Sequence, residues 1–317
     1  MKAIVQNRYG SPHALELKEV AKPTINDDGV LVKVHAISVN VGDYFSVTGV
    51  PWMIRFSIGF PRPRDYVPGW DIAGYVESVG RNVTRVKPGD AVFGTCEHAF
   101  AEYTTTSENS LATKPANLTF EQAAAVPTAA LTALQGIRDK GKVRPGQRVL
   151  VNGASGGVGS FAIQIAKTLG AEVTGVCSSR NVEMVRALGA DHVVDYTNED
   201  FTRSGDRYDL ILDNVANKSF SAYRRALAKG GLVLPNSGHG GMSYVMKAAL
   251  LSIFMRSVGR PFMTRSSHED FITLKEMLET GKLKPVIDRT YTFPEIPEAI
   301  DYVGTNRARG KVVITMK

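Results

Sequence analysis

Apolar positions in the first third of the chain alternate with polar ones or form short uninterrupted runs. The runs are rich in β-branched residues, as in 30–39, and glycines separate them, a pattern typical of β-strands. Strands are predicted over 1–6, 30–39, 69–80, 87–94 and 100–107. Four prolines lie between residues 51 and 68. That segment is predicted to be an irregular loop, because proline at this density disfavours helices and central strands.

The pattern changes near residue 119, where helical and strand-like segments begin to alternate. Thr119 followed by Gln122 fits a capping box, which predicts a helix over 119–137. Further strands are predicted over 148–153, 171–178, 190–196, 208–215 and 232–238, and helices over 156–170, 181–189 and 219–231. Alternation of this kind is characteristic of βαβ units and a parallel sheet.

The alternation stops near residue 267. The rest of the chain predicts a helix over 269–282, a strand over 286–293, a short helix over 296–306 and a last strand over 310–316. We expect this tail to return to the N-terminal β-rich domain. The predicted domains are therefore 1–122 together with 267–317, and an inserted α/β domain over 123–266.

Composition narrows the function classes. The chain has 317 residues, 43% hydrophobic and 22% charged, as ordinary globular proteins do. Its two cysteines exclude a disulfide scaffold and favour a reducing, cytoplasmic compartment. No apolar run is long enough for a membrane span, and the first residues lack the apolar core of a signal peptide. The net charge of +7 favours anionic partners in general, but no basic block or zinc-finger spacing indicates nucleic acid.

One glycine-rich segment carries specific chemistry. Residues 152–159 read NGASGGVG between a predicted strand and a predicted helix, which is the context that the dinucleotide fingerprint G-x-G-x-x-G requires. Ala154 stands at the first glycine of that pattern, where alanine can serve if its φ stays negative. Gly156 lets the backbone approach a pyrophosphate, and Gly159 lets the helix pack close to the strand. The helix N-terminus offers N–H groups to the phosphates. The predicted cofactor loop comprises Ala154, Ser155, Gly156, Gly157, Val158 and Gly159, and the domain is predicted to be a Rossmann-type, doubly wound parallel sheet.

The residues after the second strand of this domain indicate which dinucleotide is bound. NAD-selective sites usually carry Asp or Glu about 20 residues beyond the glycines. Here Ser178, Ser179 and Arg180 stand at the strand tip, with no carboxylate among them. Two hydroxyls and a guanidinium suit the 2′-phosphate of NADPH. NADPH is therefore the predicted cofactor.

Several motifs together resemble one protein family along nearly the whole chain. They are Val39-Asn40-x-x-Asp43, Pro68-Gly69-x-Asp71-x-Ala73-Gly74, Lys87-Pro88-Gly89-Asp90, the loop from Ala154 to Gly159, Gly281-Lys282-Leu283 and Arg309-Gly310-Lys311-Val312-Val313. The chain resembles the zinc-free quinone oxidoreductase (zeta-crystallin-like) branch of the medium-chain dehydrogenase/reductase superfamily. The resemblance implies a GroES-like β-rich catalytic domain with an inserted Rossmann domain and an active site in the cleft between them. We also expect a homodimer.

Departures from the zinc-dependent relatives predict that no metal is bound. Asn40 and Trp70 stand where those relatives carry a cysteine and a histidine, and they cannot replace that zinc pair. The four-cysteine lobe is missing, and Cys96-Glu97-His98 in its place would alternate across a strand. Without a Lewis acid, the site suits acceptors that take hydride readily. We therefore expect reduction of quinones or α,β-unsaturated carbonyls (enones and enals).

The resemblance points to three candidate catalytic residues, each with a structural alternative. Asn40 is the first candidate for a hydrogen-bond donor near developing charge, or else a turn residue at a strand end. Asp43 is a candidate catalytic carboxylate or a loop cap. Tyr44 is a candidate proton donor or a packing residue. Enoyl-reductase relatives carry a tyrosine near residues 51–52 that this chain lacks, which argues against a fatty enoyl-thioester reaction.

Further cofactor contacts follow from the resemblance, each with a scaffold role as the alternative. Thr128 stands where the family approaches the nicotinamide, and Tyr196 stands where it reaches the adenosine phosphate. Residues at the carboxyl ends of later strands line the ligand crevice in such sheets. The remaining expected contacts are Asn214, Val215, Ser237, Gly238 and Lys311.

Two questions stay open at this level. The methionine-rich segment 242–263 fits an adaptable wall of an acceptor pocket, a membrane-surface helix or a dimer contact. A noncatalytic NADPH-binding protein that serves as an RNA-binding or structural module is an alternative function, although no basic motif interleaved with aromatics supports it. A zinc-free alcohol dehydrogenase or aldehyde reductase is a third interpretation.

Overall fold

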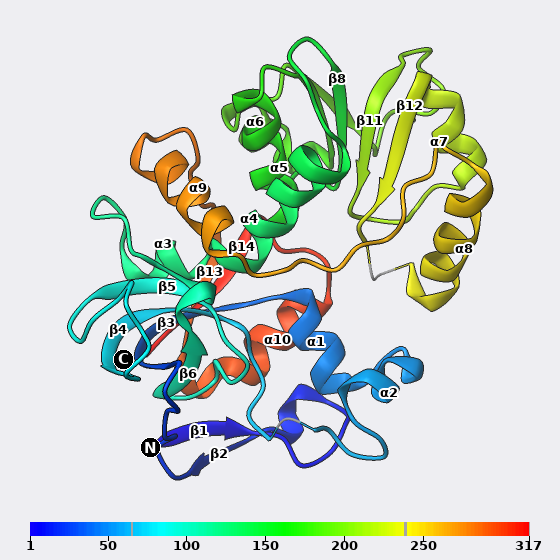
Figure 1. Cartoon of the computed structure of the whole chain (residues 1–317). Helices are drawn as coiled ribbons and strands as arrows, with labels where there is room; N and C mark the ends of the chain where they lie inside the picture. The colour runs from blue at the N-terminus through cyan, green and yellow to red at the C-terminus, as the bar shows by residue number, and fades with distance from the viewer. Residues whose placement is uncertain (65, 238–239, 317) are drawn as a thin grey trace. The chain divides into compact units, whose positions relative to one another are not determined.

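The computed structural model describes residues 1–64, 66–237 and 240–316. Its chain divides into two compact units (Figure 1), Met1–Leu131 with Arg265–Lys317, and Thr132–Thr264. The predicted boundaries after residues 122 and 266 lie near these divisions and stay predictions. Each unit has its own sheet and is described by itself.

The first unit is built on a seven-stranded sheet around the long strand β3 (Gly29–Val39). The strand pairs antiparallel with β4 (Asp71–Val79) and, near its end, with β14 (Lys311–Thr315). The C-terminal tail therefore returns to the N-terminal β-rich unit. The other strands of the sheet are β5 (Ala91–Thr95), β6 (Tyr103–Ser107), β7 (Leu111–Thr113) and β13 (Ile287–Thr292), while β1 (Lys2–Val5) and β2 (Glu16–Glu19) form a separate pair.

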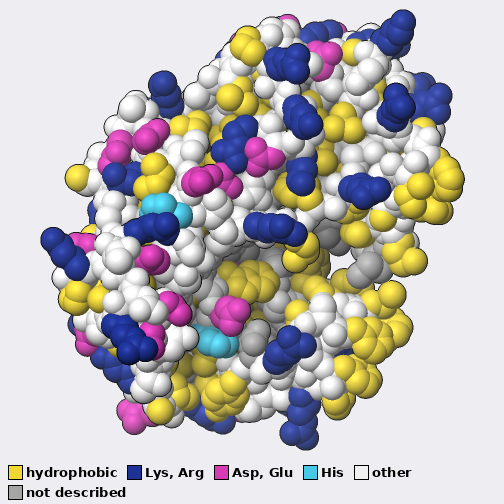
Figure 2. All heavy atoms as spheres, in the orientation of Figure 1, with side chains coloured by type: hydrophobic (Ala, Val, Ile, Leu, Met, Phe, Trp, Pro, Cys, Tyr) yellow, Lys and Arg dark blue, Asp and Glu magenta, His cyan; other side chains and the backbone are white. Residues whose placement is uncertain are grey.

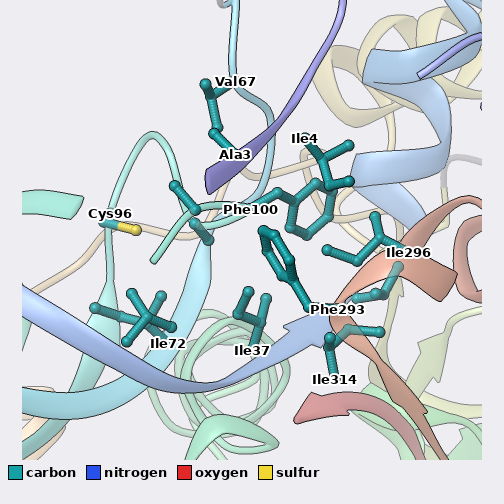
Figure 3. Close-up of a cluster of buried hydrophobic side chains, with 14 of the residues drawn as sticks. Ala3, Ile4, Ile37, Val67, Ile72, Cys96, Phe100, Phe293, Ile296 and Ile314 are labelled. Atoms are coloured by element: carbon teal, nitrogen blue, oxygen red, sulfur yellow. The ribbon is translucent and has the colours of Figure 1, made fainter. Parts of the chain in front are cut away.

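A large apolar cluster forms much of the core of this unit. Figure 3 shows Ile37 and Ile72 from neighbouring strands around the rings of Phe100 and Phe293. Burying large side chains of this kind contributes about 1.5–3 kcal/mol each. The helices of the unit are α1 (Val41–Thr48), α2 (Arg55–Ile58), α3 (Phe120–Ala124), α9 (His268–Glu279), α10 (Ile296–Gly304) and the first part of α4 (Pro127–Leu134), with 3₁₀ turns at Pro12–Ala14, Trp52–Ile54, Glu108–Ser110 and Phe293–Glu295.

The prediction of an irregular loop over 51–68 is wrong for its first part. Helical turns Trp52–Ile54 and Arg55–Ile58 follow Pro51. Pro51 lies at the N-cap, where a missing backbone N–H costs nothing, so it does not prevent helical turns. Trp52 and Phe56 in these turns and Phe60 after them are exposed by 60, 64 and 65%, and apolar side chains gather over α2 at the lower right of Figure 2.

The second unit contains five parallel strands in the order β10-β9-β8-β11-β12. Chain order reverses between β8 and β11, which is the topological switch point of a Rossmann sheet. The strands are β8 (Arg148–Asn152), β9 (Glu172–Cys177), β10 (His192–Asp195), β11 (Tyr208–Asp213) and β12 (Leu227–Pro235), and the helices are α5 (Gly157–Thr168), α6 (Val182–Ala187), α7 (Phe220–Ala226) and α8 (Gly241–Phe254), with a π-helical turn at Gln135–Lys140 and a 3₁₀ turn at Ser179–Asn181.

Two predicted helices have different bounds in the structure. The helix predicted over 119–137 is divided into α3, α4 and a π-helical turn, because Pro127 cannot donate within a continuous helix and begins a new one. The helix predicted over 219–231 ends at Ala226, and Leu227 already pairs with Tyr208 as the start of β12. Strand pairing therefore overrides the helical pattern there.

Helix α8 carries part of the methionine-rich segment. Met246, Leu250, Ile253 and Phe254 are exposed on it by 58 to 78%, and Ala248 is buried. Among the described residues, no helix is long and apolar enough to cross a membrane.

Candidate functional site

The glycine loop of the second unit joins β8 to α5. Gly153 takes the left-handed conformation, with φ of +80°, whereas Ala154 keeps a negative φ and is fully buried. Gly156 is the N-cap of α5. A Cβ at Gly159 would overlap the backbone of Gly153 and Ala154, so only glycine lets the helix approach the strand this closely. The first N–H groups of α5, which lack acceptors within the helix, are available to an anion.

The tip of β9 carries no carboxylate of its own, but one from the neighbouring strand lies beside it. Asp195 ends β10 next to β9, and its carboxylate accepts a hydrogen bond from the Ser179 hydroxyl at 2.6 Å. Hydrogen bonds from Ser179 and Thr197 hold the pKa of Asp195 below its ordinary value. Sequence reasoning missed Asp195 because parallel pairing, not chain order, brings it to Ser179.

Other predicted contacts cluster around this tip. Arg180 is exposed in the turn that leads into α6, and Tyr196, 56% exposed, directly follows Asp195. The buried Asn181, which sequence reasoning missed, donates to the hydroxyl of Ser155 at 2.9 Å and, more weakly, to that of Ser178 at 3.4 Å. This side chain therefore ties the glycine loop to the end of β9.

A buried carboxylate organises the switch point. Asp213 ends β11 and is fully buried, and it accepts from the Asn152 amide at 2.9 Å and from the backbone N–H groups of Val215 and Ala216 at 3.1 and 3.0 Å. The Tyr244 hydroxyl donates to its other oxygen. Burial first, and then the charge of Asp213, raise the pKa values of Tyr223 and Tyr244, so both remain phenols.

The same network places two predicted contacts at the strand ends. Asn214 donates from its backbone and its amide to the carbonyl of Asn152, at 3.1 and 3.2 Å. A Cβ at Gly153 would lie 2.8 Å from Val215, so Val215 packs over the glycine loop. Ser237 is buried after β12, and Gly238 lies outside the described residues.

A second polar cluster is buried in the first unit around Asp71. Asp71 begins β4, Asn40 follows β3, and Lys311 begins β14. Pairing of these strands sets Ser38 opposite both Asp71 and Val313, which brings the three side chains together. Thr128 joins them from the first turn of α4. Asp71 is fully buried and Lys311 is 3% exposed.

Each polar group in this cluster is bonded to another. The Asn40 amide donates to Asp71 at 2.9 Å and to the Ser38 carbonyl at 3.4 Å, and its oxygen accepts from the Lys311 ammonium. That ammonium lies 3.5 Å from the Asp71 carboxylate. Thr128 donates to Asp71 from its hydroxyl at 2.5 Å and from its backbone at 3.1 Å. Of the predicted residues, Asn40, Thr128 and Lys311 thus meet at Asp71.

Asp43 adds a second buried carboxyl beside Asn40. One oxygen accepts from the Asn40 backbone N–H at 2.7 Å, and the other has no hydrogen-bond partner. Burial, and to a smaller extent the charge of Asp71, raise the pKa of Asp43, while the Asn40 N–H and the charge of Lys311 lower it; together they place this pKa at about 7. Burial also lowers the pKa of Lys311, against the pull of Asp71 and Asp43.

Tyr44 and Trp70 lie in apolar contacts beside this cluster. The ring of Tyr44 packs against Gly304, where a Cβ would overlap it, and joins the hydrophobic core. The Trp70 ring covers Gly42 in the same way. His98 is bonded to the Val67 carbonyl at 2.8 Å. Within the described residues, no group of three or more His, Cys, Asp or Glu side chains is arranged to hold a metal ion.

Comparison with known proteins assigns the family. Residues 26–136 match the family model of the alcohol dehydrogenase GroES-like domain, and residues 188–314 match that of zinc-binding dehydrogenases. The chain is 35% identical to the 2-methylene-furan-3-one reductase of Solanum lycopersicum, over 99% of this chain and 79% of that protein. The chain belongs to the quinone oxidoreductase branch of the medium-chain dehydrogenase/reductase superfamily.

Two further relatives agree with this assignment. The NADPH-dependent alkenal/one oxidoreductase of Arabidopsis thaliana is 34% identical, over 99% of this chain and 79% of that protein. The solved quinone oxidoreductase from Coxiella burnetii is 29% identical with a TM-score of 0.89, over 100% of this chain and 99% of that one.

In this medium-chain dehydrogenase/reductase, sequence reasoning missed two central carboxylates. Asp71 belongs to one of the sequence motifs, but a carboxylate directly before the buried apolar pair Ile72-Ala73 is itself a signal. Asp213 directly follows the buried apolar run Leu210-Ile211-Leu212 of β11. A buried carboxylate must be paired or hydrogen-bonded, so each of these positions indicates a polar network.

Proposed function

We propose that this protein uses NADPH to reduce quinones or α,β-unsaturated carbonyls by hydride transfer, without zinc. The observation that carries the proposal is the glycine loop, which opens α5 beside the switch point of a parallel sheet. Support for the substrate class comes from its relatives, which include a 2-methylene-furan-3-one reductase, an alkenal/one oxidoreductase and a quinone oxidoreductase.

The residues of the second unit fit a dinucleotide. The first turn of α5 would hold the pyrophosphate through backbone N–H groups. Ser178, Ser179, Arg180 and Tyr196 would surround the adenosine ribose and its 2′-phosphate. The Ser179 hydroxyl already donates its hydrogen to Asp195, so it is not free to donate to that phosphate. Arg180 would therefore be the main group that binds the phosphate. Asn214, Val215, Ser237 and Gly238 remain candidate contacts at the strand ends.

The residues of the first unit fit the reacting end of the cofactor. Reduction of an enone adds one hydride at the β-carbon and one proton at the α-carbon, and NADPH supplies the hydride. Thr128 would orient the nicotinamide. Asn40 would place a polar group near the developing charge, and its hydrogen bonds to Asp71 and Lys311 would fix the orientation of its amide. Asp43, with a pKa of about 7, can hold a proton near neutral pH, and Tyr44 remains a candidate proton donor.

The experiment that tests this proposal is oxidation of NADPH against a panel of quinones, enones, enals and aldehydes. We expect saturable turnover of quinones or enones and little turnover of simple aldehydes. The matched control repeats the panel with NADH. Binding of NADPH without turnover of any acceptor would favour the noncatalytic alternative, and turnover of aldehydes alone would favour an aldehyde reductase.

We further propose that the protein is a cytoplasmic homodimer. Both cysteines are free and buried, which suits a reducing compartment. The exposed apolar side chains of α8 and α2 offer surfaces for a second copy. Light scattering on the purified chain tests the oligomeric state, for which we expect twice the mass of 34.4 kDa. A monomer at micromolar concentration would contradict it.

A further inference from the structure

The buried Asn181 lies at the N-cap of α6 without capping that helix. It is 4% exposed, and asparagine is favoured at this position because its side-chain oxygen can accept an N–H group of the first helical turn. Among the described residues its side chain makes no such bond, and its oxygen Oδ1 has no hydrogen-bond partner. A buried carbonyl oxygen without a partner costs stability, so another interaction must account for this orientation of the side chain.

The amide nitrogen of Asn181 is directed at the glycine loop. Its NH₂ group donates to the hydroxyl of Ser155 at 2.9 Å and, more weakly, to that of Ser178 at 3.4 Å. Ser155 directly precedes Gly156, the N-cap of α5, and Ser178 directly follows β9. Both hydrogens of the amide are therefore directed at hydroxyl oxygens of the proposed dinucleotide site.

The bond from Asn181 determines the hydrogen-bonding polarity of Ser155. A serine hydroxyl has one hydrogen and two lone pairs. The NH₂ group can only donate, so it occupies a lone pair of Ser155 and leaves the hydrogen. Within the part of the chain that the structure describes, the Ser155 hydroxyl makes no other hydrogen bond, and the residue is partly exposed. Its hydrogen is therefore available to an acceptor that binds from outside.

The surroundings of this hydroxyl favour an anion as that acceptor. The first N–H groups of α5 lack acceptors within the helix, because its earliest bond runs from the Ser160 N–H to the Gly156 carbonyl at 2.9 Å. These N–H groups and the positive end of the helix dipole attract negative charge. Ser155 stands directly before this helix end. A hydroxyl that offers its hydrogen there adds to anion binding, whereas one that offers a lone pair opposes it.

We propose that Asn181 is a positioning residue of the dinucleotide site, which makes the Ser155 hydroxyl a hydrogen-bond donor to the pyrophosphate of the cofactor. This inference rests on the proposed function, in which the first turn of α5 holds that pyrophosphate. It involves residues of the second unit only. Asn181 acts through Ser155, and its unbonded oxygen is the consequence of turning the amide toward the loop instead of capping α6.

The test measures the dissociation constants of NADPH, NADH and ADP-ribose for the full chain. All three contain the pyrophosphate, whereas NADPH alone carries the 2′-phosphate and ADP-ribose lacks the nicotinamide. Ser155→Ala should weaken all three about 10-fold, because a hydrogen bond to a charged group is lost. Asn181→Ala should weaken all three about 3-fold, because the hydroxyl remains but is no longer oriented.

A double-mutant cycle shows whether Asn181 acts through Ser155. In the Ser155→Ala background, Asn181→Ala should change the three affinities by less than about 1.5-fold, because no hydroxyl remains to be oriented. Asn181→Asp keeps the size of the side chain and can cap α6, but its carboxylate would accept the Ser155 hydrogen. It should weaken binding about 10-fold or more in the wild-type background. In the Ser155→Ala background we expect about 3-fold, from the added charge alone.

Thermal melts accompany every binding measurement. If Asn181→Ala melts far below the wild type, the two Asn181→Asp measurements carry the comparison, since aspartate is also a favoured N-cap residue. An Asn181 substitution that costs the same affinity with and without the Ser155 hydroxyl would show that the side chain only supports the loop. That result would overturn the inference.

The remaining outcomes separate this inference from the proposed function. Failure of the wild type to bind any of the three ligands would overturn the proposed function and, with it, this inference. Binding by the wild type that Ser155→Ala leaves unchanged would overturn the inference alone. A loss in Ser155→Ala that is confined to NADPH would assign the hydroxyl to the 2′-phosphate and would likewise overturn the inference alone.

Discussion

The hydroxyl of Ser179 donates to the carboxylate of Asp195 at 2.6 Å, across the ends of two neighbouring parallel strands. A carboxylate next to the ribose position favours NAD, whereas an arginine favours the 2′-phosphate of NADP. This chain carries both, with Asp195 on one strand end and Arg180 in the turn after the other. We therefore expect cofactor preference to depend on the balance between these two residues.

Arg180→Ala should weaken NADPH binding much more than NADH binding. A charge-assisted contact with the 2′-phosphate is worth about 1.5–3 kcal/mol, or roughly 10- to 150-fold, and NADH lacks that phosphate. The measurement is the dissociation constant of each cofactor. Arg186→Ala, which removes an exposed arginine of α6, is the control. Equal losses for both cofactors, or no loss, would show that Arg180 is not the selector.

Asp195→Asn should shift the preference further toward NADPH. Removing this carboxylate removes its repulsion of the phosphate and an acceptor for ribose hydroxyls, so we expect the NADPH-to-NADH affinity ratio to rise about 3- to 10-fold. Glu183→Gln is the matched control, because it removes one negative charge from the exposed surface of α6. A ratio that stays constant or falls would mean that Asp195 contacts neither cofactor.

Asn40→Ala should lower kcat/KM while the chain stays folded. Loss of a preorganised polar group near developing charge costs up to about 10²–10³ in rate. We expect about 10-fold for a quinone, which accepts hydride readily, and more for an enone. The melting temperature should fall modestly, because Lys311 and Asp71 each lose a partner.

Kinetics with both acceptors and thermal melts test this prediction together. Asn82→Ala, which removes an exposed amide bonded to Asp28, serves as the control. Unchanged rates would assign Asn40 a bystander role. A collapsed melting transition would instead assign it the structural role of holding the end of β3.

Asp43 should make folding stability decrease as the pH rises from about 4 to about 7. Its folded pKa of about 7 lies above the ordinary value of 3.8, so in this range the native state binds more protons than the unfolded state. Stability then falls with pH and levels off above the folded pKa. Asp43→Asn should remove this slope, and its advantage over the wild type should be greatest above pH 7.

Denaturant unfolding of both proteins at pH 5, 6, 7 and 8 measures this effect. The variant keeps an oxygen to accept the Asn40 N–H, so the helix cap is retained. Parallel pH profiles for the two proteins would rule out a raised pKa for Asp43.

The purified protein should contain no stoichiometric zinc, and chelators should leave its activity intact. Asn40 and Trp70 replace the cysteine and histidine of zinc-dependent relatives, and neither is a zinc ligand in that role. The Asn40 amide is bonded within the Asp71 cluster, and the Trp70 ring lies against Gly42. Elemental analysis that finds about one zinc per chain would refute this prediction.

The sequence by itself determined the elements whose signal is local. The strand, glycine loop and helix over residues 148–168 follow from apolar periodicity and from four glycines between residues 153 and 159. The capping box of Thr119 and Gln122 is likewise present in the structure. Such features depend on neighbours along the chain, so their physical causes can be seen in the sequence.

Only the tertiary structure decided which distant groups meet. Asn40 and Lys311 are 271 residues apart, and the pairing of β14 with β3 brings them together around Asp71. Parallel pairing of β9 with β10 likewise brings Asp195 to Ser179, and pairing with Tyr208 converts Leu227 from helix to strand. Strand register acts over distances along the chain that local propensity does not encode. Which polar side chains come together is therefore a property of the fold.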